Sequence, residues 1–140
     1  MKRLFLFLLA AASVGAGACC SCRQAAKLQQ PLEKTSWHLI QIMARDVVPT
    51  GDSFTLMFDG EGNASGVGAC NSFMAQYTTT PQRALHIDNI ASTRMMCPNQ
   101  SAESEYFDVL DRATHYEMDA DKMLLLSNGE LIAIFQAKTE

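Results

Sequence analysis

Apolar residues spaced two apart constrain the fold of this chain more than any other feature. Phe54, Leu56 and Phe58 alternate with residues that face the other way, which is the period of a strand with one buried side. Similar short runs rich in aromatic and branched residues predict further strands at 37–42, 64–68, 73–77, 84–87, 115–118, 123–127 and 131–136. The sequence therefore indicates a sheet of many short strands.

Turn residues separate these strands. In the strand expected at 37–42, the period places Trp37, Leu39 and Gln41 on one face. The segment 59–63 contains Gly60 and Gly62, which accept the positive φ of a tight hairpin. The segment 78–81 predicts a loop, and Asn128-Gly129 is the strongest short hairpin signal in the chain.

One helix is expected among the strands. Five apolar residues recur with helical spacing and form one stripe: Ala102, Tyr106, Val109, Leu110 and Ala113. Asn99 or Ser101 is suited to cap this helix, and Glu103 and Glu105 place negative charge near its first turn. Strands, one helix and a terminal hairpin predict an antiparallel, β-rich α+β domain.

The N-terminus has the layout of a secretory signal peptide. Lys2 and Arg3 precede the apolar run 4–12, and small residues continue to Ala18. A stable membrane-spanning helix needs roughly 20 mostly apolar residues, which this segment does not provide. We therefore expect residues 1–18 to be a signal peptide.

Cys19 follows this segment directly. Ala16-Gly17-Ala18-Cys19 resembles a bacterial lipobox, although Ala16 stands where Leu is usual, and the same bond also suits ordinary signal-peptide cleavage. A polar stretch follows, as in lipoproteins. We expect lipidation of Cys19 in preference to Cys20 or Cys22, and a polar tether over 19–34. The domain, 35–140, would then be anchored in the bacterial cell envelope, facing the periplasm or at the outer membrane.

The net charge bears on the kind of partner, and the cysteines bear on how the domain is cross-linked. Removal of residues 1–18 takes away two positive charges and no negative one, so the formal net charge changes from −4 to −6. An acidic domain argues against a nucleic-acid partner. Cys70 and Cys97 stand alone in the domain, and in an exported protein they are most simply a disulfide. Two buried free thiols are the alternative.

Two motifs give a resemblance to a known family. The segments Gly68-Ala69-Cys70-Asn71-Ser72-Phe73 and Thr93-Arg94-Met95-Met96-Cys97 occur in this order, between Trp37 and the acidic helix. The chain thereby resembles the META domain of HslJ-type bacterial heat-shock proteins over about 35–135. The resemblance implies a strongly curved or barrel-like sheet with one packed helix. It also makes these residues family-motif structural positions: Trp37, Gly68, Asn71, Phe73, Thr93, Arg94, Met95 and Met96.

No catalytic residue, metal site or cofactor is expected. Cys97 with His86 or His115 would be a nucleophile pair, but no third orienting group is visible. Soft ligands for Cu(I) are offered by Cys97 and three methionines, Met74, Met95 and Met96. Methionines more often fill irregular cores, which is the role we expect for them here.

Two polar motif residues receive local roles. Arg94 is suited to bind an anion or a carboxylate, and we expect it to pair with Asp88 or with an acid of the helix. Asn71 is expected to bond the backbone in the turn that follows Cys70.

The family resemblance also implies a function. It implies a non-enzymatic protein of the envelope stress response, or of tolerance to toxic compounds, which acts by binding an envelope protein or a small ligand. Two other classes stay open, a small curved-sheet carrier of an apolar ligand and a thiol or metal enzyme. The large apolar residues on the strands indicate a filled core, so the interaction module ranks above the carrier.

Overall fold

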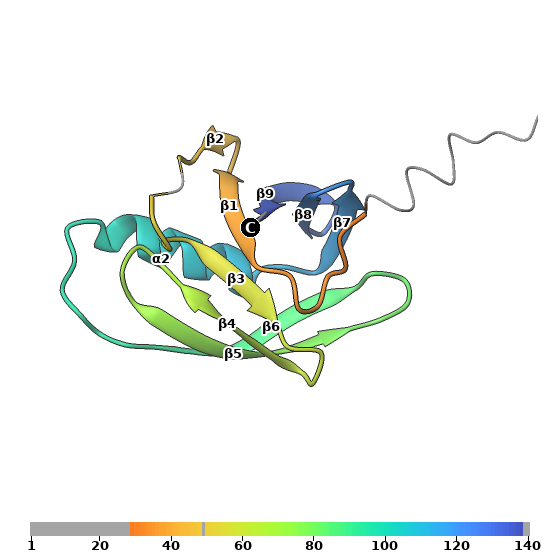
Figure 1. Ribbon diagram of the computed structural model, residues 1–140, viewed down its shortest axis with the longest axis horizontal. Coiled ribbons are helices and arrows are strands. Elements are labelled where there is room, and N and C mark those ends of the chain that lie inside the picture. Colours follow the sequence, from red (N-terminus) through yellow and green to blue (C-terminus); the bar gives the residue numbers. More distant parts are fainter. Residues whose placement is uncertain (1–28, 49, 139–140) are drawn as a thin grey trace, which may run out of the picture.

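The computed structural model describes residues 29–48 and 50–138 (Figure 1). The expected signal peptide, and the expected lipidation of Cys19, lie outside these residues. The described chain contains, in order, β1 (Trp37–Ile42), β2 (Arg45–Asp46), β3 (Thr55–Phe58), β4 (Asn63–Val67), β5 (Ser72–Thr79), β6 (Leu85–Ser92), α2 (Gln100–Asp111), β7 (His115–Asp119), β8 (Lys122–Ser127) and β9 (Glu130–Ala137). No helix in this part is long and apolar enough to cross a membrane.

The strands form one antiparallel sheet that curves but does not close. Its order is β6-β5-β4-β3-β1-β9-β8-β7, with β2 beside β1. The two outer strands meet at one end, where Ala84 forms an isolated bridge with His115 and the Leu85 N–H donates to the Thr114 carbonyl at 3.1 Å. The predicted α+β class, with a curved sheet or partial barrel and one helix, is therefore confirmed (Figure 1).

The helix fills the curve of the sheet through its apolar side. The predicted stripe is buried at Tyr106, Val109 and Leu110, and at Ala113 just beyond the helix. The hydroxyl of Tyr106 donates to the Thr55 carbonyl at 2.8 Å. Its ring packs against four phenylalanines, Phe54, Phe73, Phe107 and Phe135. Tyr106 thus packs the helix against β5 on one side and β9 on the other.

The N-terminal segment is fastened along the sheet before β1 begins. The Gln30 N–H donates to the Ala120 carbonyl at 3.1 Å, and Trp37 Nε1 donates to the Leu32 carbonyl at 2.9 Å. The buried Tyr77 hydroxyl donates to Glu33 at 2.8 Å. Burial, together with the Glu33 carboxylate, raises the pKa of Tyr77 to about 12. These contacts hold residues 30–33 against the sheet.

The predicted face of β1 is correct at Trp37 and Leu39 and wrong at Gln41. The pairing of β1 with β9 shifts register between Leu39 and Gln41. One extra residue in a strand reverses the side chains that follow it, so a β-bulge turns Ile42 inward. Ile42 is accordingly buried, and Gln41 is only half-buried.

Strands β5 and β6 are longer than the sequence indicated. The loop expected at 78–81 begins after Thr79, and the strand expected at 84–87 continues to Ser92. The sequence did not predict this continuation because Asp88 and Asn89 are polar residues with low strand propensity. Pairing with β5 overrides that propensity, and a register shift opposite Asn89, whose φ is 55°, accommodates it.

The expectation that methionines fill the core is wrong for most of them. Among the described methionines, Met123 is fully buried, and Met118 packs partly against the core. Five others are exposed: Met43, Met57, Met74, Met95 and Met96. The interior is instead filled by aromatic and branched residues, with Trp37, Phe58, Phe135 and Tyr106 the largest fully buried side chains.

Candidate functional site

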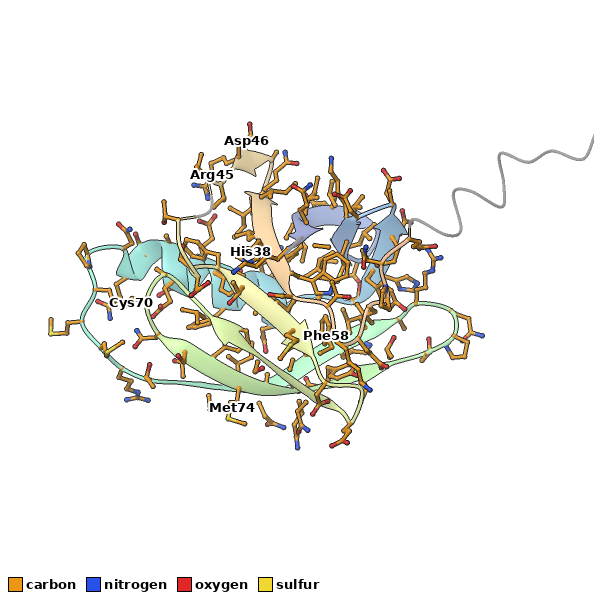
Figure 2. The ribbon with its side chains drawn as sticks, viewed as in Figure 1. His38, Arg45, Asp46, Phe58, Cys70 and Met74 are labelled. Carbon is orange, nitrogen blue, oxygen red and sulfur yellow. A yellow bond between two sulfur atoms is a disulfide. The ribbon has the colours of Figure 1, made fainter. Side chains whose placement is uncertain are left out.

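Both sequence motifs meet at the N-terminal end of α2. The turn 68–71 joins β4 to β5, and the loop 93–99 joins β6 to the helix, so the sheet brings the two segments together. Cys70 and Cys97 form a disulfide with their Cα atoms 6.4 Å apart, and Figure 2 shows Cys70 beside the helix. We call the turn 68–71, the loop 93–99 and the first turn of α2 the corner. The disulfide, rather than two free thiols, therefore closes this corner.

Glu103 is the centre of the corner, and its carboxylate is buried. Its Oε2 accepts the backbone N–H groups of Cys70 at 3.1 Å and Asn71 at 2.9 Å. Its Oε1 accepts the side-chain amide of Asn71 at 2.6 Å. Burial disfavours the charged form, but the hydrogen bonds from Asn71 and from the turn outweigh burial and hold the pKa of Glu103 below its ordinary value. Glu103 is therefore a charged anchor for the turn.

Asn71 connects the turn to both neighbouring segments. Beyond its bond to Glu103, its Nδ2 donates to the Met95 carbonyl at 3.1 Å. Its Oδ1 accepts the Met95 N–H at 2.7 Å and the Thr93 hydroxyl at 2.8 Å. The expectation of a backbone bond within its own turn was too local, because the amide instead reaches a loop 24 residues away. A buried amide with this many partners sets the position of the loop.

Two glycines permit this close approach. A Cβ on Gly68 would lie 2.7 Å from Glu103 Oε2 and 2.8 Å from its Cγ. A Cβ on Gly66 would collide with the Thr55 backbone on the neighbouring strand. Glycine at these positions therefore lets the helix and β3 pack directly against the turn and β4.

The remaining motif residues divide into buried and exposed groups. Trp37 and Phe73 belong to the core. Thr93 continues the sheet, since its N–H donates to the Ser72 carbonyl at 3.0 Å, and its hydroxyl binds Asn71. Arg94 and Met96 are exposed, and the expected pairing of Arg94 is wrong: the ion pairs in the described part of the chain do not include it.

Sequence reasoning missed the role of Glu103. It was expected to complement the helix dipole, whereas its side chain turns inward. Asn99 occupies the N-cap position but makes no side-chain capping bond. A signal was present, because Glu103 lies three residues before Tyr106 and seven before Leu110, on the buried stripe of the helix. A carboxylate on such a stripe requires buried donors.

The reactive side chains of the corner already have partners within it. The sulfur of Cys97 is in the disulfide, so it offers no thiol to His86 or His115. Within residues 29–48 and 50–138, no group of three His, Cys, Asp or Glu side chains is placed to hold a metal ion. The Glu103 carboxylate is occupied by three donors of the turn. The motifs thus join a turn, a loop and a helix.

The fold and this corner define a class of protein: a small α+β domain in which an open curved sheet holds one helix, closed by a disulfide over a buried carboxylate. The family model described as the META domain matches residues 30–139. The chain therefore belongs to the META domain family, as its two motifs predicted.

Solved structures share this fold. An NMR structure of a protein from Burkholderia xenovorans is 24% identical, covers 100% of this chain and 99% of its own, and superposes with a TM-score of 0.60. A crystal structure of a DUF4847 family protein from Bacteroides vulgatus is 18% identical, with 77% and 94% covered and a TM-score of 0.60. No protein of curated function matches the sequence.

Proposed function

We propose that this protein is a non-enzymatic META-domain lipoprotein of the bacterial envelope. It serves envelope stress resistance, or tolerance of toxic compounds, by binding an envelope protein or a small ligand. The signal-peptide layout of residues 1–18 and the position of Cys19 support the anchor. Membership of the META family supports the binding role.

The non-enzymatic part of the proposal rests on the hydrogen bonds that the polar side chains of the two motifs and Glu103 already make within the corner. The side-chain oxygens of Glu103 and Asn71 accept hydrogen bonds from within the corner. Catalytic acids and nucleophiles need polar groups that remain available to a substrate. The side-chain oxygens of Glu103 and Asn71 instead hold the turn and the loop in place.

The proposed anchor keeps the domain close to the bilayer. The fastened segment begins near Gln30, so about ten residues separate it from Cys19. A fully extended chain of that length spans at most roughly 35 Å. Contacts of the domain are thus confined to the membrane surface and its immediate surroundings.

A filled interior supports the interaction module over the carrier. Side chains of every strand from β3 to β6 meet Trp37, Tyr106 and Phe135 in one buried cluster. A carrier barrel needs an enclosed interior volume for its ligand. The hollow beside Leu131, about 310 Å³, instead opens on the outer surface between the β1–β2 turn and β9.

Deletion and complementation test this function. A strain without the gene is compared after heat and after amphiphilic antibiotics, with the wild-type gene, a Cys19→Ser gene or an empty vector restored. The proposal expects sensitivity on deletion, rescue by the wild type, and weak rescue by Cys19→Ser. Intact mass of the wild-type protein from the envelope should show acyl chains on Cys19.

Each outcome bears on a separate part of the proposal. Unchanged sensitivity of the deletion strain would overturn the stress role. An unlipidated mature protein, or full rescue by Cys19→Ser, would overturn the anchor. A Cys97→Ser protein that folds but loses all activity would restore the thiol enzyme.

A further inference from the structure

The exposed apolar surface of this domain is built mainly of methionine. Seven large hydrophobic side chains are exposed in the described residues, and the two that are not methionine are Val48 and Leu131. The exposed fractions are 95% for Met96, 68% for Met74, 56% for Met95, 43% for Met57 and 38% for Met43. Packing does not require thioethers at such positions, since the core is complete without them.

Two of these methionines, Met57 and Met74, lie on one side of the sheet. Met57 on β3 pairs with Ser65 on β4, Ser65 pairs with Met74 on β5, and Met74 pairs with Ala91 on β6. Residues paired in this way share a face of a sheet. Figure 2 shows the side chain of Met74 pointing outward from β5. Two small residues therefore leave the thioethers of Met57 and Met74 open to solvent.

The most exposed thioethers lie on the loop that the corner holds. Asn71 binds both the N–H and the carbonyl of Met95, and the disulfide fixes Cys97 two residues later. These contacts use the backbone and the sulfur of Cys97, and they leave the side chains of Met95 and Met96 outside. The loop therefore tolerates a change of polarity at both side chains without losing its anchors.

We propose that these five methionines, Met43, Met57, Met74, Met95 and Met96, are oxidant-reactive sites on the protein surface and that they react with hypohalous acids. One thioether and one hypochlorous acid give one sulfoxide, one chloride and one proton. The sulfur loses two electrons and the chlorine gains two. Susceptibility follows exposure, and a sulfoxide is polar, so it is accommodated in solvent and not in a core. This inference rests on the proposed envelope stress function and names the toxic compound.

Controlled oxidation of the purified full-length mature protein tests the chemistry. Its remaining thiols are first blocked with iodoacetamide, and hypochlorous acid is then added in increasing molar ratios. Peptide mass mapping should show sulfoxide at Met96 first, then at the other four, and at Met123 about tenfold more slowly because it is buried. The thermal midpoint should stay unchanged while only the five exposed sites are oxidised.

Two results of this experiment would overturn the proposal. Met123 could be oxidised as fast as Met96, in which case exposure does not govern reactivity. Alternatively, the midpoint could collapse at the first oxygen added to the five sites, in which case these thioethers are structural.

A cellular experiment separates this inference from the proposed function. A gene with all five methionines changed to Leu, a second with Met95→Gln and Met96→Gln, and a control with Met118→Leu are compared in the deletion strain. Each protein is first shown to keep the wild-type thermal midpoint, and a five-Leu protein that does not fold leaves the decision to the Gln pair.

The proposal expects the control to protect against hypochlorous acid as the wild type does. It expects at least a threefold loss of survival with the five-Leu gene or the Gln pair, and unchanged protection against heat. Equal protection by every gene, or no protection by the wild type, would overturn the oxidant role. Heat protection tests the stress function by itself.

Discussion

Glu103→Gln is the substitution that most directly tests the structural reading of the motif corner. Glutamine keeps the size of the side chain but replaces one carboxylate oxygen by an amide donor. If the remaining oxygen faces the two backbone N–H groups, the new amide faces the Asn71 amide, and that bond is lost. Hydrogen bonds to a charged group contribute about 1.5–3 kcal/mol each, and those to a neutral group less. We expect a total loss of about 3 kcal/mol.

Urea unfolding followed by the fluorescence of Trp37, the single tryptophan, measures this loss. For a domain of about 100 residues, 3 kcal/mol corresponds to a fall in thermal midpoint of roughly 15 °C. The pKa of Glu103 is lowered on folding from 4.5. The stability that its charge contributes is therefore present above about pH 4.5 and lost as pH falls through the folded pKa. The difference between wild type and variant should consequently shrink below pH 4.5.

Glu105→Gln is the matched control, because Glu105 lies on the same helix and forms an exposed ion pair with Arg45. Its midpoint should stay close to that of the wild type, since exposed pairs contribute little. A Glu103→Gln protein as stable as the control at pH 7 would refute the reasoning. So would a difference from wild type that is the same at pH 7 and at about pH 3.5.

Three further predictions concern the same domain. Replacing both Cys70 and Cys97 by Ser should leave the protein folded and lower its stability by about 3.5 kcal/mol, because the bridge closes a loop of 27 residues; urea unfolding measures this. Gly68→Ala should cost about 1–3 kcal/mol by overpacking against Glu103, measured by thermal unfolding. The pKa of Tyr77 is raised to about 12 on folding, so its contribution to stability is complete below about pH 10 and is lost as pH rises through 12. Tyr77→Phe should therefore reduce the alkaline loss of stability in urea titrations between pH 8 and 11.

Each of these predictions has its own control. Reducing agent should bring the wild type to the stability of the double serine variant, and an unchanged midpoint on reduction would contradict the first. In a Glu103→Ala background the cost of Gly68→Ala should disappear, and full additivity would contradict the second. Tyr77 should not ionise near pH 10 in absorbance titrations of the folded protein; if it does, the third is wrong.

The sequence by itself determined the position of β3, the buried face of α2 and the last hairpin. Period-two runs predicted the β3 strand, helical spacing predicted the face of α2, and Asn128-Gly129 predicted the last hairpin, with φ of 50° and 87°. These properties depend on neighbouring residues, so local patterns are sufficient to show them. The family resemblance, carried by two short motifs, supplied the curvature of the sheet.

Only the tertiary structure decided how distant segments satisfy one another. The inward turn of Glu103 depends on donors 32 and 33 residues away, and the partners of Asn71 lie on a loop 24 residues away. The bulge that buries Ile42 depends on pairing with β9, at the other end of the domain. The exposure of the methionines depends on a core that other residues complete. Long-range hydrogen bonding and packing have no period along the chain, so no local pattern contains them.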